Sequence, residues 1–342
     1  MNALSQDLEL ILDQTRDIWR EIRGERLLIT GGTGFFGVWL LESFCWANAR
    51  LNLDATAVVL TRRREAFAAK APHLAADPSV RFHSGDVRWF EFPEGSFSHV
   101  IHAATSASAK LNENDPLLML DTIVQGARRT LDFAVASGAR KFLLTSSGAV
   151  YGPQPSELTQ IPETYGGSPD TMDPGSAYGE GKRMAELLCA IYNKRHDIET
   201  KIARCFAFVG PHLPLDSHFA IGNFIRDRLA GGPIQVQGDG TPYRSYLYAA
   251  DLMIWLWTIL FRGKSCCPYN VGSEDGLPIR DIARTVAESG AGKRDMQVLG
   301  IAVGGPRQRY VPCTARAHRD LSLTQLTPLG EAVKKTVGWI HE

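Results

Sequence analysis

A glycine-rich loop near the start of the chain constrains the fold more than any other feature of the sequence. Gly31, Gly34 and Gly37 recur at a spacing of three, directly after the apolar run 27–29 and at the start of a helical pattern. Gly31 permits a tight turn, Gly34 lets a phosphate approach the backbone, and Gly37 permits close packing of helix on strand. Amides at a helix start attract phosphate charge. The loop therefore predicts a dinucleotide-binding turn with contacts from Gly31, Thr33, Gly34, Phe35, Phe36 and Gly37.

Short apolar runs alternate with helical patterns along much of the chain. Strands are expected near 27–29, 57–60, 80–82, 99–103, 141–145 and 201–205, and helices near 36–47, 117–136 and 177–194. This alternation predicts an α/β fold, a Rossmann-type doubly wound parallel sheet with helices on both faces. Glycine and proline interrupt the chain more often after residue 206, which predicts a smaller C-terminal substrate-binding domain.

The predicted domains follow from these patterns. Residues 1–24 precede the first strand, and apolar side chains at helical spacing predict a packing helix over 7–22. Residues 25–205 form the expected dinucleotide-binding Rossmann domain, and residues 206–342 form mainly the substrate-binding domain. Segments around 241–262 are expected to return to the Rossmann domain, with the apolar stretch 252–261 as a buried helix.

Composition and charge argue against several classes of protein. The chain has 37 Lys and Arg and 37 Asp and Glu, so no nucleic-acid partner is expected. No apolar stretch approaches the ~20 residues of a membrane-spanning helix, so no membrane partner is expected. The N-terminus is acidic and the six cysteines include no Cys-x-x-Cys pair, which favours a reduced, cytoplasmic protein. His212, Asp216 and His218 lie in a loop without metal-ligand spacing, so no metal site is predicted.

The end of the second predicted strand bears on the choice of dinucleotide. An acidic residue there commonly binds the adenosine ribose, but this chain has Arg62 and Arg63 instead. Arginine can pair with a 2′-phosphate, so the cofactor is NAD or NADP, with the arginines favouring NADP. Asp86, just past the third strand, is a candidate acceptor for the adenine amino group or a turn residue. The further predicted cofactor contacts are Val87, Ala103 and Ala104.

Three polar residues have the chemistry of alcohol oxidation. Tyr178 and Lys182 are four apart at the start of a predicted helix, so they share one helical face. Tyrosine has an ordinary pKa of about 10, and an ammonium about 4 Å away offsets roughly 4 kcal/mol of the cost of ionising it. Ser147 follows the fifth strand, at the sheet edge where ligands bind. The pattern predicts a tyrosine base whose substrate oxygen is also held by Ser147.

These motifs resemble the extended short-chain dehydrogenase/reductase family, and within it the nucleotide-sugar epimerase/dehydratase branch. The resemblance covers roughly residues 25–340 and includes the segments 146–152, 204–211 and 238–251. It implies catalytic roles for Ser147, Tyr178 and Lys182, a nucleotide-diphosphate-sugar substrate and a homodimer. Arg244 matches an arginine that holds the diphosphate, which suits its bidentate guanidinium. The other implied substrate contacts are Thr105, Asn223, Gln235 and Val236.

Departures from the family pattern bear on the reaction. Dehydratases of the branch carry Asp-Glu where this chain has Gly148 and Ala149, and the related decarboxylases use a glutamate at the position of Ala149. Glu163 or Glu180 could substitute from elsewhere. Ala207 stands where many relatives carry an asparagine.

The resemblance and these departures together favour an epimerase acting at C4 through a transient 4-keto sugar. The alternatives are an NADPH-dependent 4-keto-sugar reductase and an atypical dehydratase or decarboxylase. A non-catalytic dinucleotide sensor ranks lowest, because Ser147, Tyr178 and Lys182 are all present.

Overall fold

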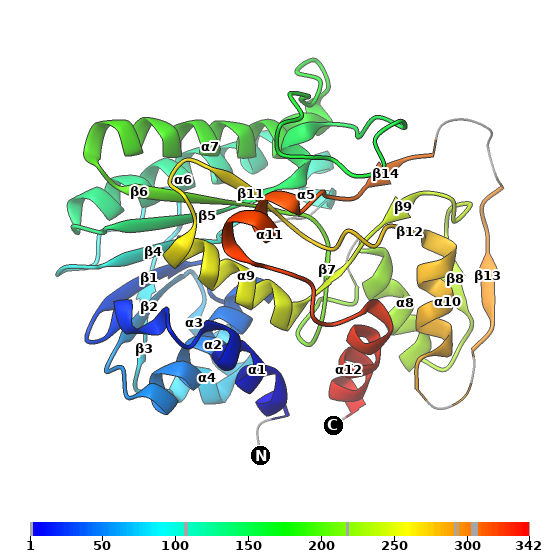
Figure 1. The fold of residues 1–342 in the computed structure, drawn as a ribbon, viewed down its shortest axis with the longest axis horizontal. Helices are drawn as coiled ribbons and strands as arrows, with labels where there is room; N and C mark the ends of the chain where they lie inside the picture. The colour runs from blue at the N-terminus through cyan, green and yellow to red at the C-terminus, as the bar shows by residue number, and fades with distance from the viewer. Residues whose placement is uncertain are drawn as a thin grey trace.

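Seven parallel strands form the centre of the computed structural model, which describes residues 3–105, 109–216, 219–290, 292, 294–301 and 307–341. The strands lie in the order β11-β6-β5-β4-β1-β2-β3 (Figure 1). Their bounds are β1 Arg26–Thr30, β2 Thr56–Thr61, β3 Val80–Ser84, β4 His99–His102, β5 Lys141–Ser147, β6 Glu199–Cys205 and β11 Pro268–Val271. The order reverses between β1 and β4, which is where doubly wound sheets bind ligands. The predicted Rossmann-type fold is confirmed.

The central strands β1, β2, β4 and β5 bury both faces, so their apolar residues divide between two cores. Leu27 and Ile29 of β1 face one core, whereas Leu28 between them faces the other. Helices α6 (Pro116–Ala136) and α7 (Ala177–His196) cover the Leu28 side. The opposite face is covered by α2 (Phe35–Leu51), α3 (Arg64–Lys70), α4 (Pro72–Ala76) and α9 (Ala249–Arg262). Helices on both faces explain the continuous apolar runs 27–29 of β1 and 57–60 of β2.

The N-terminal segment differs from the single helix predicted over 7–22. Helix α1 spans Ser5–Thr15, and a short 3-10 helix, η1, follows at Trp19–Ile22. The Thr15 hydroxyl donates to the carbonyl of Ile11 at 2.5 Å and accepts from the Trp19 indole at 2.8 Å. This side-chain bonding competes with the helical pattern and lets Trp19 pack on Trp257 of α9, with ring centroids 4.6 Å apart.

The C-terminal part consists of short elements beside the sheet (Figure 1). Its strands have two or three residues each and form three small sheets: β7 Phe208–Val209 with β10 Leu247–Tyr248, β8 Ile234–Val236 with β13 Met296–Val298, and β9 Tyr243–Arg244 with β12 Leu277–Pro278 and β14 Arg309–Tyr310. Its helices are α8 Ala220–Leu229, α10 Ile279–Glu288, α11 Ala315–Leu321 and α12 Leu329–His341. The remaining short helices of the chain are α5 Ala109–Asn114, η2 Gly148–Tyr151 and η3 Pro174–Ser176.

Two segments after residue 206 belong to the large sheet and its cover. Helix α9 contains the apolar stretch 252–261 and is buried nearly throughout. Strand β11 pairs in parallel with β6, although the sequence analysis placed 268–271 in the substrate-binding region. The strand has only four residues and starts with proline, so hydrophobic patterning does not predict it. Proline is nevertheless common at the first residue of a strand and on edge strands, and β11 is an edge strand. Within the residues described, none of the helices combines the length and apolarity that crossing a membrane requires.

Candidate active site

A large cavity lies where the strand order of the sheet reverses, between the sheet and the C-terminal part. Its volume is about 1960 Å³. The cavity is lined by all but one of the predicted site residues: Gly31, Thr33, Gly34, Phe35, Phe36, Arg62, Arg63, Asp86, Val87, Ala103, Ala104, Thr105, Ser147, Tyr178, Lys182, Asn223, Gln235, Val236 and Arg244. Gly37, the exception, is packed against the backbone of Gly31 and Gly32. One continuous space therefore joins the glycine loop to the polar residues at the end of β5.

The glycine loop has the geometry of a phosphate cradle. Gly31 has φ +73, and a Cβ there would lie 2.4 Å from the Ala103 carbonyl oxygen. A Cβ on Gly37 would lie 2.3 Å from the carbonyl oxygen of Gly31, whereas one on Gly34 would meet nothing closer than 3.5 Å. Gly34 is the N-cap of α2, where no side chain caps the free amides. The loop thus presents bare backbone N–H groups to the cavity, which suits a pyrophosphate.

The adenosine end of this cradle is basic. Arg62 and Arg63 follow β2 and line the cavity, and the Arg62 side chain is 73% exposed. Asp86 accepts hydrogen bonds from the backbone N–H and the guanidinium of Arg88, and the Arg62 guanidinium lies 3.8 Å away. The Arg88 hydrogen bond lowers the pKa of Asp86. The carboxylate that was a candidate partner for adenine is therefore already held by Arg88.

Ser147, Tyr178 and Lys182 come together at the carboxyl end of β5. Ser147 is the last residue of that strand, and its hydroxyl accepts from the backbone N–H of Ala149 at 3.1 Å. Tyr178 and Lys182 occupy the first turns of α7, with the ammonium 5.9 Å from the centre of the Tyr178 ring. The ammonium donates to the Thr105 hydroxyl and to the Thr145 carbonyl, each at 2.8 Å. The arrangement fixes a lysine charge beside the phenol.

Burial controls the protonation of this cluster. It raises the pKa of Tyr178 to about 12, against a smaller lowering by the hydrogen bond with Ser147. Burial also lowers the pKa of Lys182 to about 8. The expected lowering of the tyrosine pKa by the lysine is not seen, since Lys182, with the lower pKa, loses its charge before Tyr178 ionises. Cys205, opposite Ser147 in the register of β5 and β6, also faces the cluster.

The predicted substrate contacts line the far part of the cavity. The guanidinium of Arg244, on β9, donates to the carbonyl of Tyr243 at 2.8 Å, and burial lowers its pKa. Asn223 on α8 accepts from the Arg226 side chain at 3.2 Å. Gln235 of β8 is exposed, whereas the side chain of Val236 packs into the core. The predicted substrate contacts thus include a half-buried cation, Arg244, and an exposed amide, Gln235.

The sequence analysis missed Tyr310, which lies at the centre of the site. Its hydroxyl is 3.5 Å from that of Ser147, and the Arg244 guanidinium lies 5.9 Å from its ring centre. The phenol stacks near Phe206, with centroids 4.7 Å apart. A side chain at position 148 would enter the same space, since a Cβ there would lie 2.7 Å from Phe206 and 2.8 Å from the Tyr310 hydroxyl. The sequence feature that could have indicated Tyr310 is the pair of small residues Gly148 and Ala149, which leaves room for a bulky side chain from another part of the chain.

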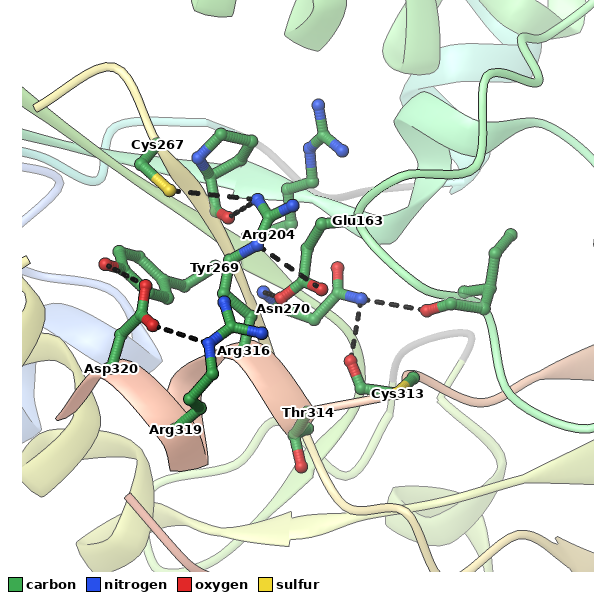
Figure 2. A network of polar contacts seen from close by, with 12 residues as sticks. Glu163, Arg204, Cys267, Tyr269, Asn270, Cys313, Thr314, Arg316, Arg319 and Asp320 are labelled. Atoms are coloured by element: carbon green, nitrogen blue, oxygen red, sulfur yellow. Dashed lines mark hydrogen bonds and ion pairs between the residues drawn. The ribbon is translucent and has the colours of Figure 1, made fainter. Parts of the chain in front are cut away.

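Neither glutamate considered as a substitute acid reaches the cavity. Glu163 accepts from the backbone N–H of Asn270 at 2.9 Å and lies 3.9 Å from Arg316 (Figure 2). Glu180 pairs with Arg183 at 3.5 Å on the outer face of α7. The described residues contain no cluster of three metal-ligating side chains. His212 packs on Trp339, and His218 lies outside the described residues.

Known proteins resemble the chain in sequence and in fold. A family model described as the NAD dependent epimerase/dehydratase family matches residues 27–272. UDP-glucuronic acid decarboxylase 2 of Arabidopsis thaliana is 31% identical over 272 residues, which make up 78% of this chain and 57% of that protein. The chain thus spans less than two thirds of that relative's length.

Two solved structures illustrate the shared fold. A dTDP-glucose 4,6-dehydratase from Streptomyces venezuelae, solved as a double mutant with NAD bound, is 23% identical with a TM-score of 0.77, over 93% of this chain and 97% of that chain. UDP-glucuronic acid 4-epimerase from Bacillus cereus, solved with UDP-glucuronic acid and NAD, is 21% identical with a TM-score of 0.75, over 92% and 99%. Together with the family match, the glycine cradle and the Tyr178–Lys182 pair, these likenesses show that the chain belongs to the NAD dependent epimerase/dehydratase family, whose members are NAD(P)-dependent enzymes of the extended short-chain dehydrogenase/reductase type.

Proposed function

We propose that this protein is a nucleotide-diphosphate-sugar epimerase that inverts C4 of the sugar through a transient 4-keto form. The observation that carries the proposal is the set of groups around Ser147. Hydroxyls, one ammonium and a thiol surround this point, and positions 148 and 149 hold no carboxylate. Epimerisation at C4 needs one group to move a proton on one oxygen, whereas elimination or decarboxylation by the family's route needs an acidic side chain as well.

The carboxylates that do line the cavity support this choice. Among the residues that the structure describes, they are Asp86, Asp170, Asp173 and Asp227. Asp86 is paired with Arg88, and Asp227 accepts from the backbone N–H of Gln235 at the outer end. Asp170 and Asp173 each accept a backbone N–H two residues later in their own loop. Each of the four therefore already stabilises local structure.

The residues of the cluster have distinct proposed roles. Gly31, Gly34 and the start of α2 would hold the pyrophosphate of NAD(P), which supplies, when bound, the acceptor for the hydride of the sugar carbon. Tyr178 removes the proton of the 4-hydroxyl and later returns it. Ser147 donates a hydrogen bond to the same oxygen. Lys182 lies beside the phenol and, while it is protonated, would stabilise the ionised form of Tyr178. Arg244 would bind the diphosphate.

The test starts from the substrate that the relatives' names suggest. Purified protein is incubated with UDP-glucuronic acid and, separately, with UDP-glucose, and the products are identified by NMR and mass spectrometry. A C4 epimer of unchanged mass supports the proposal. A pentose product with release of carbon dioxide contradicts it and supports the decarboxylase reading, which the 31% identity to UDP-glucuronic acid decarboxylase 2 favours.

The basic end of the cradle favours a second candidate, a 4-keto-sugar reductase that uses NADPH. Arg62 and Arg63 line the cavity with no carboxylate at the end of β2. Denaturing the purified protein and identifying the released dinucleotide separates the two candidates. Stoichiometric NAD supports the epimerase, because a retained cofactor suffices when no net oxidation occurs. Protein without bound dinucleotide that binds NADPH tightly supports the reductase.

The outer helices suggest that the protein forms a homodimer. Helices α6 and α7 pack side by side, and their exposed apolar side chains are Leu117, Met184, Leu187 and Ile191. The three on α7 follow a spacing of three and four, so they share one face of that helix. Such a stripe beside a second long helix suits burial against a second copy. Analytical ultracentrifugation tests this: a monomer at micromolar concentration contradicts it.

A further inference from the structure

We propose that Tyr310 is a positioning residue of the active site, which fixes the direction of the Ser147 hydroxyl proton by donating its own proton to the Ser147 oxygen. This inference rests on the proposed function only in taking Tyr178 and Ser147 as the groups that handle the sugar oxygen. The phenol comes from β14 in the C-terminal part, whereas Ser147 ends β5 of the large sheet. The site is thus completed by a residue from outside the Rossmann sheet.

The number of hydrogen bonds that Ser147 accepts determines where its own proton can point. A serine hydroxyl has one proton and two lone pairs. One lone pair accepts the Ala149 N–H at 3.1 Å, and the Tyr310 hydroxyl lies 3.5 Å from the same oxygen. With Tyr310 as the second donor, both lone pairs are used. The Ser147 proton then has to point away from Tyr310, toward Tyr178 and the sugar oxygen.

The surroundings of Tyr310 favour it as the donor. Its side chain is enclosed, and burial raises the pKa of this phenol above its ordinary value, so it keeps its proton at physiological pH. In the described part of the chain, Ser147 is the hydrogen-bond partner of its hydroxyl. A contact of 3.5 Å is long for two hydroxyls, and catalytic hydrogen bonds commonly shorten when the substrate closes the site.

A buried amide holds the segment that carries Tyr310. Asn270 of β11 donates to the carbonyl oxygens of Ile161 at 2.9 Å and Cys313 at 3.0 Å, and so joins two segments far apart in sequence (Figure 2). Its side-chain oxygen accepts from the Tyr151 hydroxyl at 2.7 Å. The backbone N–H of Ile161 also donates to Val311 at 2.9 Å. The strand next to Tyr310 is therefore tied to the sheet.

Further hydrogen bonds connect Tyr151 with the residues next to Ser147 and Lys182. Arg204 donates to the Tyr151 hydroxyl at 2.9 Å and to Glu186 at 2.6 Å. Glu186 lies one turn after Lys182 on α7 and accepts from Ser146, the neighbour of Ser147, at 2.5 Å. This unbroken set of contacts fixes Tyr310, Ser147 and Lys182 relative to one another, which a positioning role requires.

Removing the Tyr310 hydroxyl should change the titration of Tyr178. The groups that face Tyr178 are Ser147 from β5, Lys182 from α7, Cys205 from β6 and Tyr310 from β14, with Arg244 behind Tyr310. Before the sugar binds, a hydrogen bond donated by Ser147 stabilises the ionised phenol, and when the sugar is bound the same proton is donated to the sugar oxygen. Without Tyr310, the Ser147 proton can turn away, so the pKa of Tyr178 rises. Activity that needs the ionised form then begins at higher pH.

The experiment compares Tyr310→Phe with two other variants. Gly148→Ala keeps the phenol but pushes a methyl group against its hydroxyl. Tyr192→Phe is the control, because it removes a buried tyrosine hydroxyl that bonds Asp132 and does not line the cavity. For each holoenzyme we would measure kcat, KM and the pH profile of kcat/KM. Tyr178 would also be titrated by NMR of isotope-labelled tyrosine, which needs no turnover.

The expected result is a kcat about tenfold lower in Tyr310→Phe, with KM nearly unchanged and the lower-pH limb moved to higher pH. Gly148→Ala should shift the same limb in the same direction, and Tyr192→Phe should match wild type. A raised KM with unchanged kcat and pH profile would make Tyr310 a wall of the sugar site and overturn the proposal. Should wild type turn over none of the sugars, the proposed function fails, while an unshifted Tyr178 titration in Tyr310→Phe still overturns this inference.

Discussion

The two sides of the cavity are built by different means. On the sheet side, strands of four to seven residues pair in continuous parallel register, and the glycine loop and Ser147 lie at their ends. On the C-terminal side, Arg244 and Tyr310 sit on strands of two residues. Regular backbone pairing supplies most of the framework of the first side. The second depends on individual side chains, such as Asn270 and Asp239, whose carboxylate accepts from the N–H and hydroxyl of Thr241.

This difference predicts where substitutions affect chemistry and where they affect structure. A side chain on a regular element can lose its functional group without loss of the element. A side chain that holds irregular segments together cannot be removed without moving them.

The largest expected effect is on chemistry at the sheet side. Tyr178→Phe should lower turnover by about a thousandfold, equivalent to roughly 4 kcal/mol, because general acid–base catalysis is lost. The fold should stay intact, since α7 is packed by other residues of the helix. Turnover and circular dichroism measure the two effects. A variant that keeps a tenth of wild-type activity would place the essential base elsewhere in the cavity.

The next largest effect is on structure at the C-terminal side. Asn270→Ala should lower the free energy of unfolding by about 3 kcal/mol, because the Tyr151 hydroxyl and two carbonyls lose buried partners. Urea unfolding measures it. Gln160→Ala removes an exposed hydrogen bond from the same loop and should stay within about 0.5 kcal/mol of wild type. Equal effects of the two variants would show that Asn270 does not hold these segments.

The sheet side could be predicted from the sequence because its signals are local. The spacing of Gly31, Gly34 and Gly37 and that of Tyr178 and Lys182 reflect geometry within one loop or one helix. The alternation of strands and helices likewise predicts a doubly wound parallel sheet. Each of these signals is carried by short stretches of the sequence.

The C-terminal side could not be predicted in the same way. Tyr310 reaches Ser147 across a separation of 163 residues, and no periodic pattern surrounds it. Strand β11 adds four residues to the large sheet beside β6, although the two strands are separated in sequence by residues 206–267. The pKa of Tyr178 could not be predicted from the sequence either, because the burial that raises it, and that lowers the pKa of Lys182, emerges only in three dimensions.

A third prediction concerns buried histidine on the sheet side. Burial, with Arg140 and Lys141 nearby, lowers the pKa of His99 to about 3. In the unfolded chain His99 has an ordinary pKa of about 6.5, so the unfolded state binds a proton at this residue more tightly than the folded state does. The free energy of unfolding therefore decreases as the pH falls from 6.5 toward 3. Between pH 8 and pH 5 this amounts to about 2 kcal/mol. His99→Phe should remove that part of the pH dependence.

Urea unfolding at pH 8 and pH 5 compares wild type with His99→Phe. The His99 ring already packs near Phe261, and its Nε2 has no hydrogen-bond partner among the described residues, so phenylalanine suits the site. His102, whose pKa burial also lowers to about 3, remains in both proteins and contributes equally. An unchanged difference between the two pH values would mean that His99 is protonated in the fold.

A smaller effect should separate binding from stability within the glycine loop. Gly34→Ala places a methyl group in ordinary contact and should leave the melting temperature unchanged. It should weaken NAD(P) binding about tenfold, or roughly 1.4 kcal/mol, because the methyl group occupies the approach to the pyrophosphate. Gly37→Ala, the matched change, meets the Gly31 carbonyl and should lower the melting temperature. Calorimetry of both variants checks this, and a destabilised Gly34→Ala would contradict it.

The smallest effect on the stability of one chain is expected on the outer helices of the sheet side. Leu187 of α7 is 52% exposed, so Leu187→Glu should change the free energy of unfolding of the single chain by less than about 0.5 kcal/mol. The same change puts a charge into the apolar stripe with Met184 and Ile191, and burying that charge against a second copy is costly. Sedimentation should therefore show a dimer for wild type and a monomer for the variant. The control is Leu326→Glu, which changes a comparably exposed leucine outside α6 and α7 and should leave the protein dimeric. If both the Leu187→Glu and the Leu326→Glu variants are monomers, the loss of the dimer is not specific to the stripe on α7.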